Sequence, residues 1–217
     1  MRSIAVLGGT FDPIHQAHLE LAEILHNQLA FEKILLIPCK QNPLKNHVIA
    51  NTEQRVEMIR LAMNEAALFS PDYEYDLREV KQDNASITID TLKALRQNYP
   101  KGSLTFTMGV DAFNDLDQWD NFEALLDYAH LLIFPRPGFS LAPKPLVQRL
   151  IDQYQTDKIH HLHGKKQGHI YFSSIPEAPI SSTVIRALLK KRDLSPLQLA
   201  LPKAVLTYIQ VEHLYGL

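Results

Sequence analysis

Two glycines followed by two histidines form the segment of this sequence that is most able to do chemistry. The run is Gly8-Gly9-Thr10-Phe11-Asp12-Pro13-Ile14-His15-Gln16-Ala17-His18, directly after a short apolar stretch at 4–7. Glycine has no Cβ, so the pair allows a sharp turn at a strand end and a close approach of the backbone to a ligand. Apolar residues then recur at helical spacing, which predicts a helix that begins near Gln16.

The start of this predicted helix is suited to binding phosphate. Its unpaired N–H groups and the helix dipole make that end electropositive. His15 and His18 are spaced to lie on one side of the first turn, where both rings can donate to an anion. The alternative is a strand, turn and helix whose histidines only cap and pack. We predict a phosphate site with His18 and His15 as its catalytic candidates.

A second helix start lies in the C-terminal part of the chain. Ser181, Ser182 and Thr183 precede apolar positions at helical spacing, so one of them is expected to be the N-cap. Arg186 follows Thr183 by three residues and projects over the same first turn, where it can face an anion. Capping alone would explain the hydroxyl residues, but it would not explain the arginine.

Short apolar runs alternate along the chain with segments of helical period. The alternation predicts an α/β fold, with a Rossmann-like, doubly wound, mainly parallel sheet, helices on both faces and a helical C-terminal segment. Ligands of such sheets bind outside the carboxyl ends of the strands, where the glycine pair would lie. Helices are expected from Asn51, with Gln54 as its capping partner, and over 88–96. Strands are expected near 3–7, 33–37, 73–80, 104–108, 130–134 and 170–173.

Composition narrows the class of protein. A chain of 217 residues with 46% hydrophobic content can bury one core, so we expect a single domain over 1–217. The formal net charge is −2, and the charged residues are spread along the chain. This pattern argues against a surface that binds nucleic acid or a membrane. The only cysteine, Cys39, excludes an internal disulfide, and no signal peptide is recognisable, so a cytoplasmic location is expected. Homo-oligomer formation is left open.

The two helix starts together resemble the nucleotidylyltransferases that are marked by a His-x-Gly-His motif. His15-Gln16-Ala17-His18 matches that motif except at Ala17, and 180–186 is similar to the family's Ile-Ser-x-Thr-x-x-Arg element. The resemblance implies that this element holds the β- and γ-phosphates of ATP. A dehydrogenase is disfavoured because no Gly-x-Gly-x-x-Gly follows the first expected strand.

Further motifs narrow the resemblance to the nicotinate mononucleotide adenylyltransferases, over essentially the whole chain. Gly109-x-Asp111 corresponds to the pair that lies against the ATP ribose, and Arg136 to the family's Arg-Pro-Gly loop near the phosphates. The implied ATP-binding residues are Gly8, Gly9, Thr10, Phe11, Gly109, Asp111, Ser182, Thr183 and Arg186.

The same resemblance implies a mononucleotide site. Trp119, the only tryptophan, corresponds to the aromatic residue on which the nicotinate ring stacks, with a place in the core as the alternative. Thr88 belongs to a segment that meets the pyridine carboxylate, unless it only caps a helix. The implied mononucleotide-binding residues are Lys45, Thr88, Trp119 and Arg136.

Three departures from the family pattern fall on this mononucleotide side. Leu44 stands where the family has a phosphate-binding histidine, so either Lys45 does more, with Lys40 or His47, or the mononucleotide binds less tightly. The alternative for Lys45 is a simply solvated side chain. Ile87 replaces a tyrosine, and Gln82 replaces a basic residue. The ATP side therefore matches the family better than the mononucleotide side.

The resemblance implies adenylyl transfer from ATP to nicotinate mononucleotide, giving deamido-NAD and pyrophosphate by direct in-line displacement. His18 would donate to the α-phosphate and His15 would assist it. Mg²⁺ would arrive on the ATP phosphates, and no protein ligands dedicated to a metal are expected. The alternatives are a related adenylyltransferase for nicotinamide mononucleotide, phosphopantetheine or a flavin nucleotide, and a nucleotide-binding regulator without catalysis.

A histidine-rich segment has no place in this scheme. It contains His160, His161 and His163, with His169 beyond two glycines and two lysines. Imidazole is a common metal ligand, but the neighbouring residues favour a solvated loop. Cys39 is expected to be a small buried residue without a role.

Overall fold

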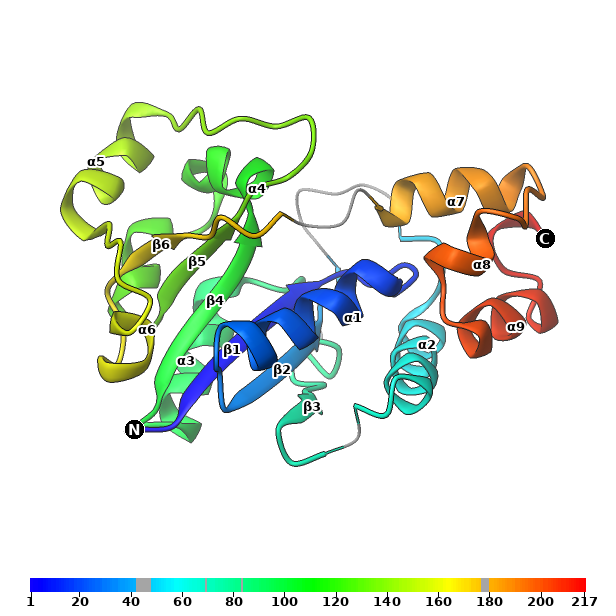
Figure 1. The fold of residues 1–217 in the computed structure, drawn as a ribbon, viewed down its shortest axis with the longest axis horizontal. Helices are drawn as coiled ribbons and strands as arrows, with labels where there is room; N and C mark the ends of the chain where they lie inside the picture. The colour runs from blue at the N-terminus through cyan, green and yellow to red at the C-terminus, as the bar shows by residue number, and fades with distance from the viewer. Residues whose placement is uncertain (42–47, 69, 83, 177–179) are drawn as a thin grey trace. The chain divides into compact units, whose positions relative to one another are not determined.

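The computed structural model describes residues 1–41, 48–68, 70–82, 84–176 and 180–217. Its six strands form a sheet in the order β3-β2-β1-β4-β5-β6, and the pairs β1–β4, β4–β5 and β5–β6 are parallel (Figure 1). Strand order reverses where β1 meets β4, so the predicted Rossmann-like, doubly wound fold is confirmed. The strands are β1 Ser3–Gly9, β2 Lys33–Pro38, β3 Tyr73–Tyr75, β4 Ser103–Gly109, β5 His130–Phe134 and β6 Ile170–Phe172.

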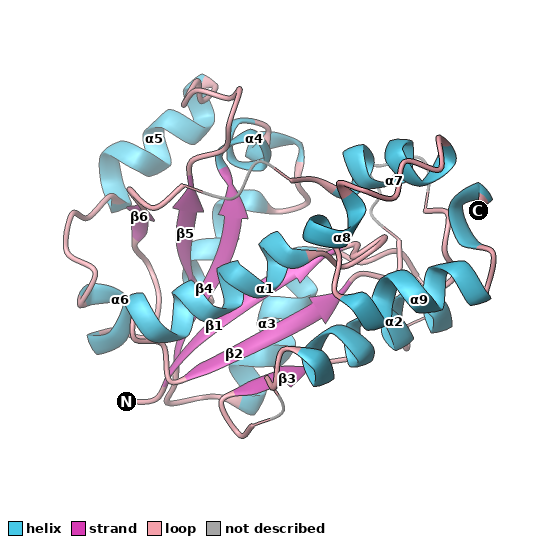
Figure 2. Ribbon diagram, turned by 45° about the vertical axis from the view of Figure 1, so that its right-hand side comes forward, coloured by secondary structure: helices cyan, strands magenta, loops and turns pink. Residues whose placement is uncertain are grey.

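Helices follow most of these strands, as the alternating pattern predicted (Figure 2). Among the described residues they are α1 Gln16–Glu23, α2 Thr52–Glu65, α3 Thr88–Asn98, α4 Val110–Asn114, α5 Pro145–Tyr154, α6 His161–Gly164, α7 Ser182–Lys190, α8 Leu197–Ala200 and α9 Lys203–Val211. A π-helical turn, η1 Ile24–Gln28, extends α1, and 3-10 turns occur at η2 Leu116–Gln118, η3 Phe122–Asp127 and η4 Leu214–Gly216. The described residues contain no helix that is both long and apolar enough to cross a membrane.

The prediction of a strand over 73–80 is wrong in length: the strand begins at Tyr73 but already ends at Tyr75. The Asp76 side chain accepts a hydrogen bond from the backbone N–H of Arg78 at 2.9 Å and forms an ion pair with its guanidinium at 2.6 Å. An aspartate that bonds the backbone two residues ahead favours a turn over an extended chain. The apolar alternation of the sequence does not show this local competition.

The contacts of the chain divide it into two compact units, which we describe one at a time. The first unit comprises Met1–Gly8, Leu25–Leu35 and Ile87–Glu177, and the second comprises Gly9–Ile24, Leu36–Ser86 and Ala178–Leu217. In the first unit all residues of β5 are buried, and so is every residue of β4 except the last, Gly109. Near-continuous burial is typical of parallel strands that are covered on both faces.

Helix α2 organises the second unit. Asn51 Oδ1 accepts from the Gln54 N–H, and Gln54 Oε1 accepts from the Asn51 N–H, both at 2.9 Å, so the predicted capping pair is confirmed. At the other end of α2, the Glu65 carboxylate accepts from the N–H groups of Lys203 and Ala204 at 2.8 and 2.6 Å. This carboxylate caps α9, which lies beside α2 (Figures 1 and 2).

The prediction of a solvated loop for the histidine-rich segment of the first unit holds for the exposed Lys165 and Lys166 before β6, but it is wrong for the histidines at 161–163. The segment contains the short helix α6, in which the His163 ring packs on Phe31 with centroids 4.8 Å apart. His161 stacks on His169 at 4.9 Å, and His169 stacks on the fully buried His130 at 5.4 Å. The part of the chain that the structure describes holds no group of three metal-ligating side chains.

His130 is a buried, neutral ring with a backbone partner at each nitrogen. Its Nδ1 accepts from the His169 N–H at 3.1 Å, so its Nε2 carries the proton and donates to the Lys165 carbonyl at 2.9 Å. Burial is the main cause that lowers the pKa of His130 from 6.5 to about 4, and nearby His169 and Arg96 lower it further.

The low pKa of His130 predicts a loss of stability in acid. The unfolded chain binds this proton before the folded chain does, so stability present above pH 6.5 is lost as the pH falls towards about 4. The full loss is on the order of 3 kcal/mol. We expect His130→Asn, whose Oδ1 can still accept from the His169 N–H, to flatten the pH dependence of urea unfolding between pH 7.5 and 4.5.

His213→Asn, a change of an exposed histidine, is the matched control and should keep the wild-type slope. Equal pH dependence of the free energy of unfolding in wild type and His130→Asn would contradict the assignment.

Candidate functional site

The turn after β1 is made by Phe11 and not by the glycines. β1 continues through Gly9, and Phe11 has a left-handed φ of 50°, a conformation that is rare for a bulky residue. The prediction that the glycine pair makes the turn is therefore wrong. The glycines instead make room for rings: a Cβ on Gly8 would lie 3.2 Å from the Phe106 ring, and a Cβ on Gly9 would lie 3.1 Å from the Phe11 ring.

His15 and His18 lie together at the start of α1, as their spacing predicted. His15 is the N-cap, and its backbone N–H donates to Nδ1 of His18 at 3.2 Å. Their rings stack with centroids 3.7 Å apart. The Phe11 and His18 rings form a T-shaped pair with centroids 4.9 Å apart. Because Nδ1 of His18 is an acceptor, a neutral ring carries its proton on Nε2. His15 is buried and His18 is partly exposed, so His18 is the better placed donor to a ligand.

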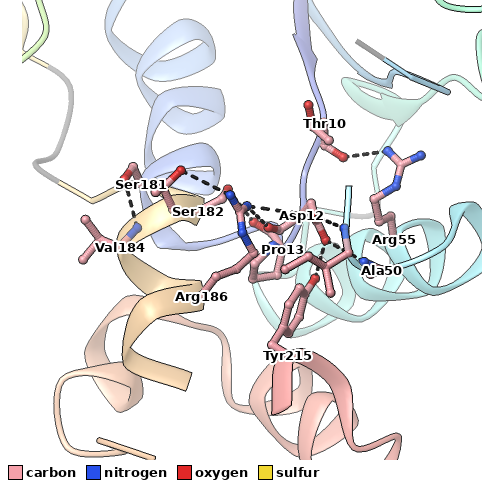
Figure 3. Close-up of polar contacts among 12 residues, drawn as sticks. Thr10, Asp12, Pro13, Ala50, Arg55, Ser181, Ser182, Val184, Arg186 and Tyr215 are labelled. Carbon is pink, nitrogen blue, oxygen red and sulfur yellow. Dashed lines mark hydrogen bonds and ion pairs between the residues drawn. The ribbon is translucent and has the colours of Figure 1, made fainter. Parts of the chain in front are cut away.

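The start of α7 is anchored on the turn that precedes these histidines (Figure 3). Ser181 is the N-cap, and its Oγ accepts from the Val184 N–H at 3.3 Å. Ser182 Oγ donates to the Pro13 carbonyl at 3.0 Å, and Arg186 Nη1 donates to the Asp12 carbonyl at 2.6 Å. The structure thus brings the two predicted phosphate segments together within the second unit.

Thr183 takes part in this arrangement through its side chain. Its Oγ1 accepts from Nη2 of Arg186 at 3.2 Å, so the guanidinium lies over the first turn of α7, as the spacing predicted. The exposed first turn therefore combines a cation with N–H groups that α7 itself leaves without helical partners.

Asp12 is a site residue that the sequence analysis missed. Its carboxylate is 1% exposed and accepts three hydrogen bonds, from the Tyr215 hydroxyl at 2.7 Å and from the N–H groups of Ile49 and Ala50 at 2.9 and 3.1 Å. Arg186 Nη1 lies 3.8 Å from Asp12 Oδ2. The signal in the sequence was an acidic residue between two apolar neighbours, Phe11 and Pro13.

Arg55 in α2 was missed as well. Its side chain is 1% exposed, and Nη1 donates to the carbonyls of Thr10 and Cys39, both at 2.7 Å. Nη2 donates to the Lys40 carbonyl at 3.0 Å. One guanidinium therefore ties together the segments that follow β1 and β2. The buried face of α2 includes Arg55, four residues before the buried Ile59, and this spacing was the available signal.

In the first unit, Asp111 and Arg136 form an ion pair. Arg136 Nη1 donates to Asp111 Oδ2 at 2.5 Å, from a loop after β5 to the first turn of α4. A Cβ on Gly109 would lie 2.5 Å from Asp111 Oδ1, so only glycine allows this position of the carboxylate. The structure thus brings together the predicted residues Gly109, Asp111 and Arg136.

The remaining predicted residues differ in how far the structure describes them. Trp119 is partly exposed, with its ring edge-on to Phe106 at 6.1 Å, so a place in the core is wrong. Thr88 is the first residue of α3 and Ile87 is the N-cap, so a capping role for Thr88 is wrong too. Lys45, with Leu44 and His47, lies outside the described residues. Cys39 is buried, as expected, and its Sγ lies 3.5 Å from Thr10 Oγ1.

Comparison with solved structures agrees with this fold. The Plasmodium falciparum nicotinic acid mononucleotide adenylyltransferase complexed with NaAD superposes with a TM-score of 0.74 at 22% identity, over 99% of this chain and 98% of that one. At this identity the likeness is one of fold.

Sequence comparisons identify the family. The cytidylyltransferase-like family matches residues 6–188. A relative from Psychromonas ingrahamii, named "Probable nicotinate-nucleotide adenylyltransferase", is 38% identical over 99% of this chain and 97% of its own length. A relative of the same name from Aeromonas salmonicida is 40% identical over 98% of this chain and 96% of its own length. The chain therefore belongs to the cytidylyltransferase-like family and, within it, to the nicotinate-nucleotide adenylyltransferases.

Proposed function

We propose that this chain transfers the adenylyl group of ATP to nicotinate mononucleotide, giving deamido-NAD and pyrophosphate. The observation that carries the site assignment is the junction of α1 and α7, where Ser182 and Arg186 bond the Pro13 and Asp12 carbonyls directly before the histidine pair. Full-length relatives with 38% and 40% identity that bear the name of this activity support the reaction. We further propose that residues 1–217 work as one nucleotidylyltransferase domain in the cytoplasm.

The reaction proposed is a direct in-line displacement. An oxygen of the mononucleotide 5′-phosphate bonds to the α-phosphorus of ATP, and the bond from that phosphorus to the leaving pyrophosphate breaks. The attacking oxygen is already ionised, so no general base is needed. Catalysis then depends on positioning and on stabilising charge at the α-phosphate oxygens.

We assign the α-phosphate contact to His18. Its Nδ1 accepts from the His15 N–H, so the proton of a neutral ring, and with it the ability to donate, is on Nε2. The stacked His15 ring, which is buried, fixes the orientation of His18. A donor held in place before the substrate arrives needs no reorganisation when charge develops.

The leaving pyrophosphate is assigned to the first turn of α7. Arg186 supplies the charge, and Ser182 and Thr183 supply the helix N-terminus. Gly8, Gly9, Thr10 and Phe11 would line the nucleotide at the end of β1. Mg²⁺ would come with the ATP phosphates and neutralise part of their charge.

The other assignments follow from the family resemblance. Gly109 and Asp111 are assigned to the ATP ribose, since a carboxylate can accept from its hydroxyls. Trp119 is partly exposed and so has an accessible ring surface for the pyridine. Thr88, Arg136 and Lys45 complete the proposed mononucleotide side.

The function is tested by measuring pyrophosphate release from ATP with each candidate co-substrate. We expect nicotinate mononucleotide to give the largest kcat/KM. A preference for nicotinamide mononucleotide, phosphopantetheine or a flavin nucleotide would replace the proposed substrate. If the chain binds ATP but releases no pyrophosphate with any of these co-substrates, it is a nucleotide-binding regulator instead.

The role of His18 predicts a selective loss of rate. His18→Ala should lower kcat by about 10²–10³, the range for one lost donor to a developing oxyanion, with little change in melting temperature. His160→Ala, a change of an exposed histidine in the first unit, is the control and should keep wild-type turnover. Near-normal turnover of His18→Ala would refute the role.

A further inference from the structure

One buried hydroxyl group near the C-terminal end has no part in the proposed reaction. Tyr215 is 7% exposed, and its hydroxyl donates to Asp12 Oδ1 at 2.7 Å (Figure 3). Burial and the neighbouring carboxylate of Asp12 raise the pKa of Tyr215, so the phenol keeps its proton and acts as a donor. The bond joins the end of the chain to the residue whose carbonyl holds Arg186.

The backbone around Tyr215 is held in an uncommon conformation. His213, Tyr215 and Gly216 have left-handed φ values of 50°, 59° and 87°. Non-glycine residues adopt this region at a cost, and they persist there when surrounding contacts hold them. Here η4 packs on α7 and α9. The packed turn therefore holds the buried phenol in a fixed position.

The distances around Asp12 separate two kinds of partner. The three hydrogen bonds to its carboxylate all come from neutral donors, namely the hydroxyl of Tyr215 and the N–H groups of Ile49 and Ala50. The cation Arg186 stays 3.8 Å from Oδ2, beyond hydrogen-bond range, and donates to the Asp12 carbonyl instead.

Removing the hydroxyl would change this balance. Asp12 Oδ1 would keep the bond from the Ala50 N–H but lose the other of its two hydrogen bonds, which is costly for a buried carboxylate. A charge-assisted bond to a guanidinium is stronger than a neutral one, so Arg186 would be drawn onto the carboxylate. The arginine would then be directed away from a bound phosphate.

We propose that Tyr215 is a positioning residue for the triphosphate: by donating to Asp12, it keeps the Arg186 guanidinium off the carboxylate and available to the leaving pyrophosphate. Tyr215 touches no substrate and acts through Asp12 and Arg186. The inference rests on the proposed function for the role of Arg186. A purely structural role, in which the phenol only anchors the C-terminal turn, is the competing explanation.

The two explanations are separated by Tyr215→Phe, which keeps the ring and deletes only the hydroxyl. We expect the KM for ATP and the inhibition constant of pyrophosphate to rise about tenfold, the scale of one hydrogen bond, while the KM for nicotinate mononucleotide stays unchanged. Tyr208→Phe, the same change in α9, is the matched control and should alter neither constant. A Tyr215→Phe enzyme with wild-type constants for ATP and pyrophosphate would overturn the proposal.

A double-mutant cycle read by calorimetric ATP binding tests the route through Arg186. In an Arg186→Met background, Tyr215→Phe should weaken ATP binding by less than about twofold, because the group through which it acts is gone. Equal weakening by Tyr215→Phe in both Arg186 backgrounds would favour the structural role and overturn the proposal.

The calorimetric readout also separates failure of this inference from failure of the proposed function. If wild type binds ATP but does not adenylylate nicotinate mononucleotide, the proposed function fails while the cycle still decides the role of Tyr215. A wild-type chain that binds neither ATP nor pyrophosphate would overturn both.

Discussion

The burial of one carboxylate, that of Asp12, determines the arrangement of the proposed phosphate site. A carboxylate removed from water must be compensated by hydrogen-bond donors or by an opposite charge, and the fold supplies donors from two segments and a cation from a third. These are the backbone at 49–50, the C-terminal turn at Tyr215 and, at longer range, Arg186 in α7. Because these segments are far apart in the sequence, one buried charge fixes the site in space without touching a substrate.

A buried cation complements this charge in the same unit. Arg55 holds the carbonyls of Thr10, Cys39 and Lys40, and so it fixes the chain on the N-terminal side of Phe11, while Asp12 fixes it on the other side. The left-handed backbone of Phe11 lies between them. Strained conformations survive where flanking interactions over-determine them, and a rigid turn is what electrostatic preorganisation of a phosphate site requires.

The sequence predicted those parts that depend on local pattern. The bounds of β5 at 130–134, the Asn51–Gln54 cap and the shared side of His15 and His18 all follow from neighbours a few residues apart. The parts that failed depend on distant partners or on local competition. Arg55 was missed because a charged residue on a helix is normally solvated, and Tyr215 because no pattern near the C-terminal end indicates a bond to Asp12. The glycine turn failed because Phe11 takes the positive φ.

The ion pair of the first unit has a consequence for nucleotide binding. A carboxylate that accepts from ribose hydroxyls would repel the phosphates of the same nucleotide if its charge were not compensated. Arg136 provides a compensating charge at 2.5 Å from Asp111 Oδ2, and both side chains are partly exposed, so the pair adds little to stability. Gly109 leaves space for Asp111 Oδ1, which is buried without a hydrogen-bond partner in the part of the chain that the structure describes, while Arg136 neutralises the carboxylate through Oδ2. The ion pair therefore joins two residues that the family resemblance assigns to different substrates, Asp111 to ATP and Arg136 to the mononucleotide.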